Sequence, residues 1–87
     1  MANYDIDIAK SVFKSLKALP KVDVKKLVAT IQSLGLDPFP DGCRKLSGEK
    51  STYRVRQGNY RVIYETDGGK LRILILKVGH RKDVYKK

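Results

Sequence analysis

The chain has 87 residues, of which 41% are hydrophobic, and 19 Lys and Arg against 9 Asp and Glu give it a formal net charge of +10. This length allows one domain, and the apolar content argues against a disordered chain. No apolar run approaches the roughly 18 residues of a membrane-spanning helix. Cys43 is the only cysteine, which excludes a disulfide-stapled secreted scaffold. Residues 1–8 lack the basic region of a signal peptide, so we expect a small cytoplasmic domain.

Positive charge is concentrated in the second half of the chain. Residues 1–43 hold six lysines and five acidic residues, a net charge of +1, whereas residues 44–87 have a net charge of +9. All the arginines lie in the second half: Arg44, Arg54, Arg56, Arg61, Arg72 and Arg81. The planar guanidinium binds two phosphate or carboxylate oxygens at once. This asymmetry favours a polyanionic partner, either nucleic acid or an acidic protein, over a merely solvated basic surface.

The first half predicts a strand and two helices. Residues 4–8 alternate with a period of two, which is typical of a short strand. An amphipathic helix ending near Pro20 is marked by Val12, Phe13, Leu16 and Leu19. A second helix is marked by Val24, Leu27, Val28, Ile31 and Leu34, with Asp23 as its expected N-cap and Gly35 as its expected C′ residue. The short connection between them predicts a helical hairpin.

The second half predicts a loop followed by an antiparallel meander. Residues 36–50 contain two prolines and two glycines and are expected to form a loop. Apolar-rich runs follow at 52–56, 60–66 and 71–78, and Gly58-Asn59 and Gly68-Gly69 between them suit two-residue hairpin turns. Residues 80–87 are expected to form a short helix or tail. The fold class is therefore α+β: a single domain over residues 1–87 with the order β-α-α-β-β-β, in which an antiparallel sheet packs against a helical hairpin.

The first hairpin turn predicts a face for each arginine. With Gly58 and Asn59 in the turn, Arg56 opposes Arg61, and directly opposed side chains share a face. Arg54, Arg56 and Arg61 then point to one side of the sheet. The other side carries Tyr53, Val55, Val62 and Tyr64 and is the expected core.

The second hairpin turn extends the two faces. With Gly68 and Gly69 in the turn, Glu65 opposes Arg72 as an ion pair. Ile73 and Ile75 join the core face, whereas Leu74, Leu76, Val78 and His80 join the arginine face. A one-residue β-bulge is the alternative, and it would scatter these residues between the faces.

The predicted arginine face has the character of a binding site. Arg56 and Arg61 are opposed like charges, which destabilise a sheet unless an anion lies between them. The same face carries Ile63, Leu74 and Leu76, so it is mixed rather than purely polar. We expect it to bind an anion and to be covered by a partner.

Few other residues suggest chemistry. His80 is the only histidine, and a histidine exchanges protons near neutral pH, although a lone histidine is more often structural. One Cys and one His do not make a metal site, and we expect no cofactor. Cys43 is more simply incidental than a nucleophile. No Ser/His/Asp set and no phosphate-binding glycine loop is present in the sequence.

Three segments in order resemble the RelE toxins of bacterial and archaeal toxin–antitoxin systems. These are Leu46-Ser-Gly48, the run Tyr53-Arg-Val-Arg-Gln-Gly-Asn-Tyr-Arg-Val-Ile-Tyr64, and Val78-Gly-His-Arg-Lys-Asp-Val-Tyr85. The resemblance implies a metal-independent endoribonuclease that cuts messenger RNA in the ribosomal A site, through attack of a 2′-hydroxyl on the adjacent phosphate. It also implies an acidic antitoxin, and a toxin–antitoxin complex that binds operator DNA through the antitoxin.

The resemblance also implies the site residues. They are Arg54, Arg56, Arg61, His80, Arg81 and Tyr85. The family's best-known members have lysines at the positions of Arg54 and Arg56, and arginine holds its proton too firmly to act as a base. His80, where some relatives have a histidine, is therefore the expected general base.

Two other functions compete with message cleavage. A ParE-like toxin would share the fold but inhibit DNA gyrase without cutting RNA. A non-catalytic RNA-binding module would use Tyr53, Tyr60 and Tyr64 as a stacking platform. The clustered arginines favour cleavage over the first alternative, and the expected burial of Tyr53 and Tyr64 argues against the second.

Overall fold

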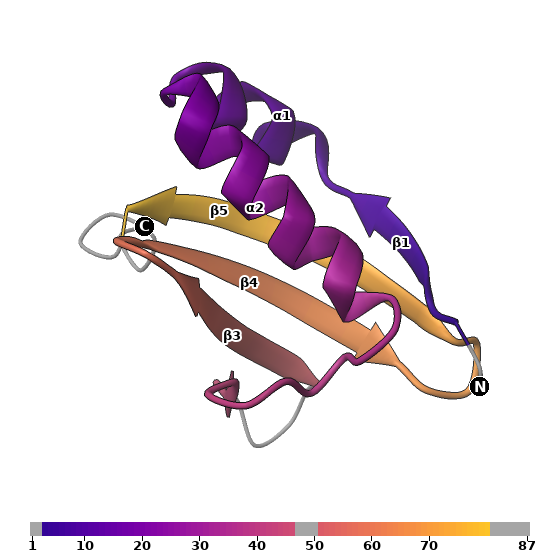
Figure 1. The fold of residues 1–87 in the computed structure, drawn as a ribbon. Helices are drawn as coiled ribbons and strands as arrows, with labels where there is room; N and C mark the ends of the chain where they lie inside the picture. Colours follow the sequence, from indigo (N-terminus) through magenta and orange to yellow (C-terminus); the bar gives the residue numbers. More distant parts are fainter. Residues whose placement is uncertain (1–2, 47–50, 81–87) are drawn as a thin grey trace.

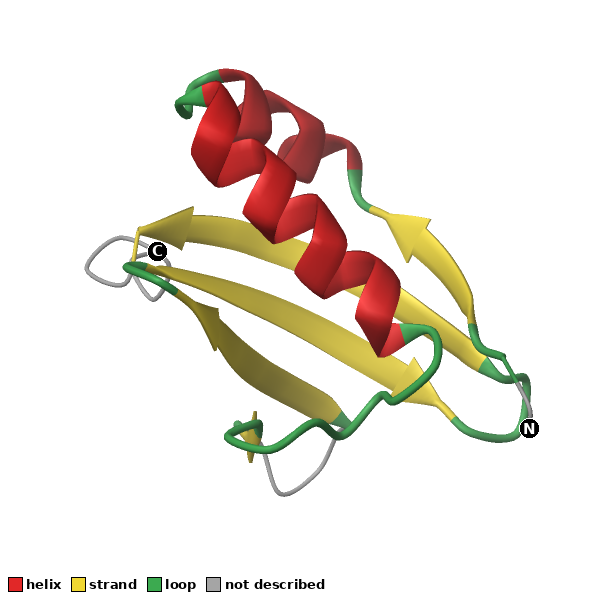
Figure 2. Cartoon of the chain, viewed as in Figure 1, coloured by secondary structure: helices red, strands yellow, loops and turns green. Residues whose placement is uncertain are grey.

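A computed structural model describes residues 3–46 and 51–80, which form two helices on one face of a five-stranded sheet (Figures 1 and 2). The elements in chain order are β1 (Asp5–Ile8), α1 (Lys10–Lys17), α2 (Lys21–Leu34), β2 (Arg44–Lys45), β3 (Thr52–Gln57), β4 (Tyr60–Asp67) and β5 (Arg72–His80). The strands are arranged β1-β5-β4-β3-β2. The predicted α+β class and the helical hairpin are confirmed.

The sheet is mixed, whereas the sequence predicted an antiparallel one. β1 pairs with β5 in parallel, with Ile6 beside Ile73 and Ile8 beside Ile75. β2 is an additional strand within the expected loop, and it is held by the Arg44–Arg54 and Lys45–Tyr53 registers. Its two residues are both charged and exposed, so no apolar alternation marks it in the sequence.

The core lies between the helical hairpin and the sheet. Its buried side chains come from both layers: Val12, Leu27, Ile31 and Leu34 from the helices, and Val55, Val62, Tyr64, Ile73, Ile75 and Val78 from the sheet. Both helices lie on one face of the sheet, and no helix of residues 3–46 and 51–80 covers the opposite face (Figure 2).

Both ends of α2 differ from expectation. Pro20 is the N-cap residue and Asp23 lies inside the first turn, where a carboxylate complements the helix dipole without capping a backbone N–H. Gly35 follows the helix in a right-handed conformation, with φ −64°. A Cβ atom at Gly35 would lie 3.2 Å from Ile6 Cδ1 and from the Tyr4 carbonyl oxygen. Close packing against β1, rather than a left-handed turn, therefore explains this glycine.

The β3–β4 hairpin has the predicted register. Arg56 pairs with Arg61, Val55 with Val62 and Tyr53 with Tyr64. Gly58 adopts φ 61° in the connecting turn, a conformation that glycine reaches without the steric cost of a side chain. Local turn chemistry thus fixed the pairing of these two strands.

The β4–β5 hairpin differs from the prediction. Its connection spans residues 68–71, so that Asp67 pairs with Arg72 and Glu65 with Leu74. The expected Glu65–Arg72 ion pair is wrong, because Arg72 Nη1 instead lies 3.9 Å from Asp7 Oδ2 on the neighbouring β1. Leu71 takes a positive φ of 51° in this connection, which a two-residue Gly-Gly turn would not require.

A β-bulge in β5 changes the face of every residue beyond it. Tyr64 pairs with Ile75 but Ile63 pairs with Lys77, which leaves Leu76 as the extra residue. Val78 and His80 are consequently opposite Val62 and Tyr60, on the face covered by the helices. The placement of Val78 and His80 on the arginine face is wrong, and Val78 is only 2% exposed within the core.

Candidate anion-binding site

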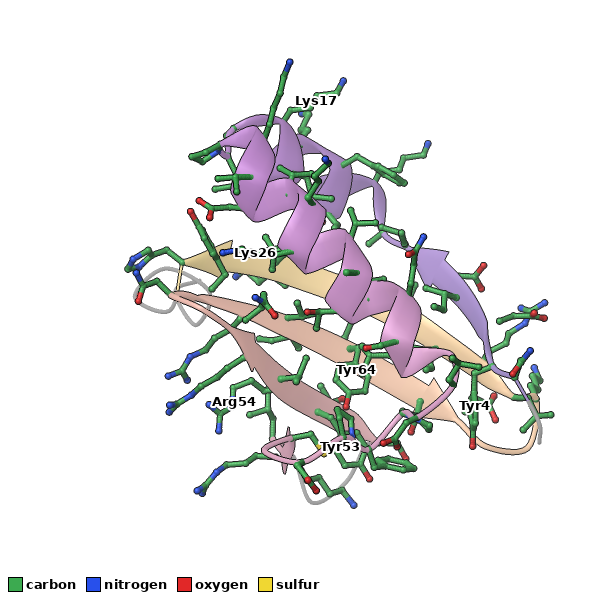
Figure 3. All side chains as sticks on the ribbon, viewed as in Figure 1. Tyr4, Lys17, Lys26, Tyr53, Arg54 and Tyr64 are labelled. Carbon is green, nitrogen blue, oxygen red and sulfur yellow. The ribbon has the colours of Figure 1, made fainter. Side chains whose placement is uncertain are left out.

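Arginines gather on the face of the sheet opposite the helices. Arg54 and Arg56 come from β3 and Arg61 from β4, and Arg56 is the direct cross-strand partner of Arg61. Figure 3 shows Arg54 on the side away from both helices. The prediction that these three arginines share one face is confirmed, since the β3–β4 register formed as expected.

Arg44 is a fourth arginine of this face and was absent from the predicted site. It is the cross-strand partner of Arg54, and directly opposed residues share a face. Its signal in the sequence was only its residue type, because no apolar alternation marks β2 and a backbone contact between Leu46 and Thr52 supports its pairing. The Leu46 N–H donates to the Thr52 carbonyl oxygen at 2.8 Å.

Arg54 is the most unusual side chain of the site. It is 5% exposed, and its Nε and Nη1 have no acceptor within residues 3–46 and 51–80. A buried donor left without a partner costs about 1–3 kcal/mol, and more when the group is charged. Binding an anion would supply acceptors for these donors and offset that cost.

A hollow of about 260 Å³ opens beside Arg54. Its lining residues are Asp41, Gly42, Arg44, Arg54, Val55 and Arg56. Gly42 has φ 86°, a conformation that favours glycine and turns the chain into β2. Among the described residues, Arg72 forms an ion pair with Asp7, and no ion pair neutralises Arg44, Arg54 or Arg56. The hollow therefore presents positive charge.

His80 lies across the sheet from these arginines. It pairs with Tyr60, and the two rings meet edge-to-face with centroids 6.0 Å apart. A second hollow of about 330 Å³ is lined by Asp23, Lys26, Gln57, Gly58, Asn59, Tyr60 and His80. The structure thus separates His80 from Arg54, Arg56 and Arg61. Arg81 and Tyr85 lie outside the described residues.

Hydrogen bonds organise this second hollow. The Tyr60 hydroxyl donates to Asp23 Oδ2 at 2.9 Å. That hydrogen bond, with some desolvation and the Asp23 charge, raises the pKa of Tyr60 above its ordinary value. The Thr30 hydroxyl donates to Gln57 Oε1 at 2.8 Å. These two hydrogen bonds join α2 to the end of the sheet, so the polar residues that line this hollow also hold the helix against the strands.

Tyr53 and Tyr64 pack against other side chains and do not form an exposed aromatic surface. Tyr64 is fully buried, its hydroxyl donates to the Pro38 carbonyl oxygen at 2.7 Å, and burial raises its pKa. Tyr53 stacks on Tyr64 with centroids 5.9 Å apart, and Phe39 meets Tyr53 edge-on at 5.0 Å. This cluster anchors the segment that leads to β2, and it is not an open platform for RNA bases.

An apolar groove runs between the helices, on the other side of the molecule. It has a volume of about 540 Å³ and is lined by Phe13, Leu16, Lys17, Leu19, Lys21, Val24 and Lys25. Phe13 is 51% exposed. Within the described ranges, neither helix is long and apolar enough to cross a membrane.

Comparisons with known proteins identify the family. A family model described as the ParE toxin of the type II toxin–antitoxin system matches residues 6–85. The putative toxin RelE1 of Methanocaldococcus jannaschii is 35% identical over 86 residues, covering 95% of this chain and 96% of the relative. The archaeal RelE–RelB complex from Pyrococcus horikoshii OT3 contains a chain of similar structure, with TM-score 0.83, 33% identity, and coverage of 94% of this chain and 99% of that one. The RelBE2 toxin–antitoxin complex of Mycobacterium tuberculosis gives TM-score 0.81 at 27% identity, over 95% and 97% of the two chains. The chain therefore belongs to the ParE toxin family of type II toxin–antitoxin systems, and it is a RelE-type toxin.

Proposed function

We propose that this toxin inhibits translation by cutting messenger RNA in the ribosomal A site. The observation that carries the proposal is the arginine face, where Arg56 opposes Arg61 and the buried Arg54 lacks acceptors among the described residues. A phosphodiester supplies acceptor oxygens and relieves the repulsion between opposed arginines. RNA has such a phosphate at every linkage.

The proposed reaction is an internal phosphoryl transfer. The 2′-hydroxyl oxygen attacks the adjacent phosphorus, the bond to the 5′-oxygen breaks, and the products are a 2′,3′-cyclic phosphate and a 5′-hydroxyl. Negative charge grows on the phosphate oxygens in the transition state. In this proposal Arg56 and Arg61, which are cross-strand partners on β3 and β4, bind those oxygens. Fixed donors of this kind stabilise a transition state more than a ground state.

Proton transfer requires other groups. One proton leaves the 2′-hydroxyl and one reaches the 5′-oxygen, and arginine stays charged throughout. His80 would have to act from the helix-side face, because the β-bulge places it opposite Tyr60. We therefore propose that Tyr85 exchanges the proton and that Arg81 adds a further cation for the phosphate oxygens. Both residues follow β5 in the sequence.

Gyrase inhibition is the second candidate function, since the matching family model is described as a ParE toxin. Binding gyrase requires a complementary protein surface but no charge stabilisation at a phosphorus atom. Opposed arginines are costly for a protein-binding surface alone, as is a buried guanidinium whose Nε and Nη1 lack acceptors among the described residues. They favour the RNA-cutting function.

The two functions separate in one experiment with the full-length toxin. Ribosomes programmed with a defined message are incubated with toxin, and primer extension maps any cut within the A-site codon. A parallel reaction measures DNA supercoiling by gyrase. We expect message cleavage and unaffected supercoiling. Inhibited supercoiling with intact message would establish the gyrase function instead.

The toxin–antitoxin family membership gives this chain an antitoxin partner. We propose that the antitoxin is acidic, because residues 44–87 carry a net charge of +9 and charge complementarity accelerates association. We also propose that the complex binds operator DNA through the antitoxin.

A further inference from the structure

Two cross-strand pairs of arginines occupy adjacent positions on the arginine face. Arg44 faces Arg54 across β2 and β3, and Arg56 faces Arg61 across β3 and β4. Arg54 and Arg56 are two residues apart on one strand, so their Cα atoms are separated by about 6.7 Å. Arg44 and Arg61 belong to the strands on either side of β3. The four side chains therefore lie along a diagonal of the sheet.

The diagonal is long for a single phosphate group. Strands lie about 4.8 Å apart, which puts the Cα atoms of Arg44 and Arg61 about 12 Å from each other. Arg54 is only 5% exposed, so drawing it toward Arg61 would take it out of its buried position. The hollow that Arg44 and Arg54 line is already beside them.

We propose that this hollow is a second phosphate subsite, which holds the backbone phosphate next to the one that is cut. Arg54 lines the hollow and contributes its guanidinium, whose buried Nε and Nη1 lack acceptors in the described chain, and Arg44 binds the phosphate from β2. Because the two pairs are about 6.7 Å apart along β3, each pair can bind a different phosphate of one strand. The inference rests on the proposed function and names its substrate as a single strand with at least two consecutive phosphodiesters.

The lining of the hollow favours a phosphodiester over free phosphate. Asp41 lines it together with the arginines, and a nearby carboxylate repels a dianion more than a monoanion. A phosphate monoester or free phosphate carries a charge of about −1.5 to −2 at pH 7, whereas a phosphodiester carries one negative charge. The charge balance of the hollow thus suits the RNA backbone.

Arg44 and Lys45 provide a matched pair of variants. Both residues are exposed and both belong to β2, but Arg44 pairs with Arg54 and Lys45 with Tyr53, so their side chains leave opposite faces. Arg44→Gln and Lys45→Gln each remove one positive charge from the same strand. Arg44→Lys retains the charge and removes the planar fork.

The probe is an RNA trinucleotide without terminal phosphates, protected from cleavage by 2′-O-methyl groups. Two further versions each carry one uncharged methylphosphonate linkage in place of a phosphodiester. Binding to full-length toxin is followed by NMR titration at several salt concentrations. We expect the wild type and Lys45→Gln to bind the doubly charged RNA about tenfold more tightly than either singly charged version, the worth of one charged hydrogen bond.

Arg44→Gln should lose most of this preference, and Arg44→Lys should lose part of it. The slope of log K against log salt should fall by about one for Arg44→Gln. An unchanged preference in Arg44→Gln, or an equal loss in Lys45→Gln, would overturn the subsite. Weaker antitoxin binding by Arg44→Gln with an unchanged RNA preference would assign the hollow to an antitoxin carboxylate and also overturn it.

The ribosome assay keeps the two proposals apart. If the wild-type toxin cuts message but does not prefer the doubly charged RNA over the singly charged versions, the proposed function stands and the subsite is refuted. The preference without message cleavage retains a phosphate subsite on an RNA-binding surface and removes the cleavage function.

Discussion

Tyr60 and His80 are cross-strand partners on β4 and β5, and their rings meet edge-to-face with centroids 6.0 Å apart. This contact holds His80 on the face of the sheet that the helices cover. The opposed pair Arg56 and Arg61 begins one position further along β4, on the other face. The histidine and the arginines therefore approach a ligand from different sides.

His80→Gln tests whether that separation excludes the histidine from proton transfer. We expect single-turnover cleavage on programmed ribosomes to stay within a few-fold of wild type, with an unchanged pH profile. General acid–base catalysis contributes typically 10²–10⁴-fold. A loss of that size, together with disappearance of one limb of the pH profile, would show that His80 reaches the phosphate after all.

Arg61→Ala tests the cation pair at the proposed scissile phosphate. The variant should fold normally and lose roughly a hundredfold or more in cleavage rate, since one transition-state donor is removed. Arg61→Lys should recover only part of the rate, because an ammonium cannot bind two oxygens as the guanidinium fork does. Arg72→Ala is the control, since Arg72 is ion-paired with Asp7. Cleavage by Arg61→Ala at the wild-type rate would remove this arginine from the mechanism.

Tyr60→Phe tests the hydrogen bond that joins the sheet to α2. The Tyr60 hydroxyl donates to Asp23 and its pKa is raised above 10.0, so the protonated form is favoured in the folded state. That stabilisation is complete below the unfolded pKa of about 10 and is lost as the pH rises through the folded pKa. The free energy of unfolding, measured with denaturant, should therefore fall more steeply above about pH 10 in wild type than in Tyr60→Phe. Parallel curves for the two proteins would contradict the assignment.

Leu74→Glu and Phe13→Glu test which apolar surface the antitoxin covers. Leu74 is 36% exposed on the arginine face and Phe13 is 51% exposed in the groove between the helices. We expect Leu74→Glu to weaken antitoxin binding at least tenfold, measured by calorimetry, because it places a like charge and a polar group against an acidic partner. Phe13→Glu is the matched control. The opposite ranking would place the antitoxin on the helical hairpin.

The sequence predicted those features of the candidate site that depend on residues close together in the chain. Gly58 and Asn59 set the β3–β4 register, and the register set the common face of Arg54, Arg56 and Arg61. Arg44 was not predictable in the same way. Its strand has two residues and no alternation, and its partner Arg54 lies ten positions away.

The sequence by itself determined the α+β class, the helical hairpin, the asymmetric charge and the first hairpin, since periodicity and turn chemistry act over a few residues. Tertiary structure decided the parallel β1–β5 pairing, the burial of Arg54 and the bulge at Leu76. The bulge places Val78 in the core and carries His80 with it. One extra residue reverses the faces of a strand because its side chains alternate with a period of two, and only packing against the helices selects where that residue is inserted.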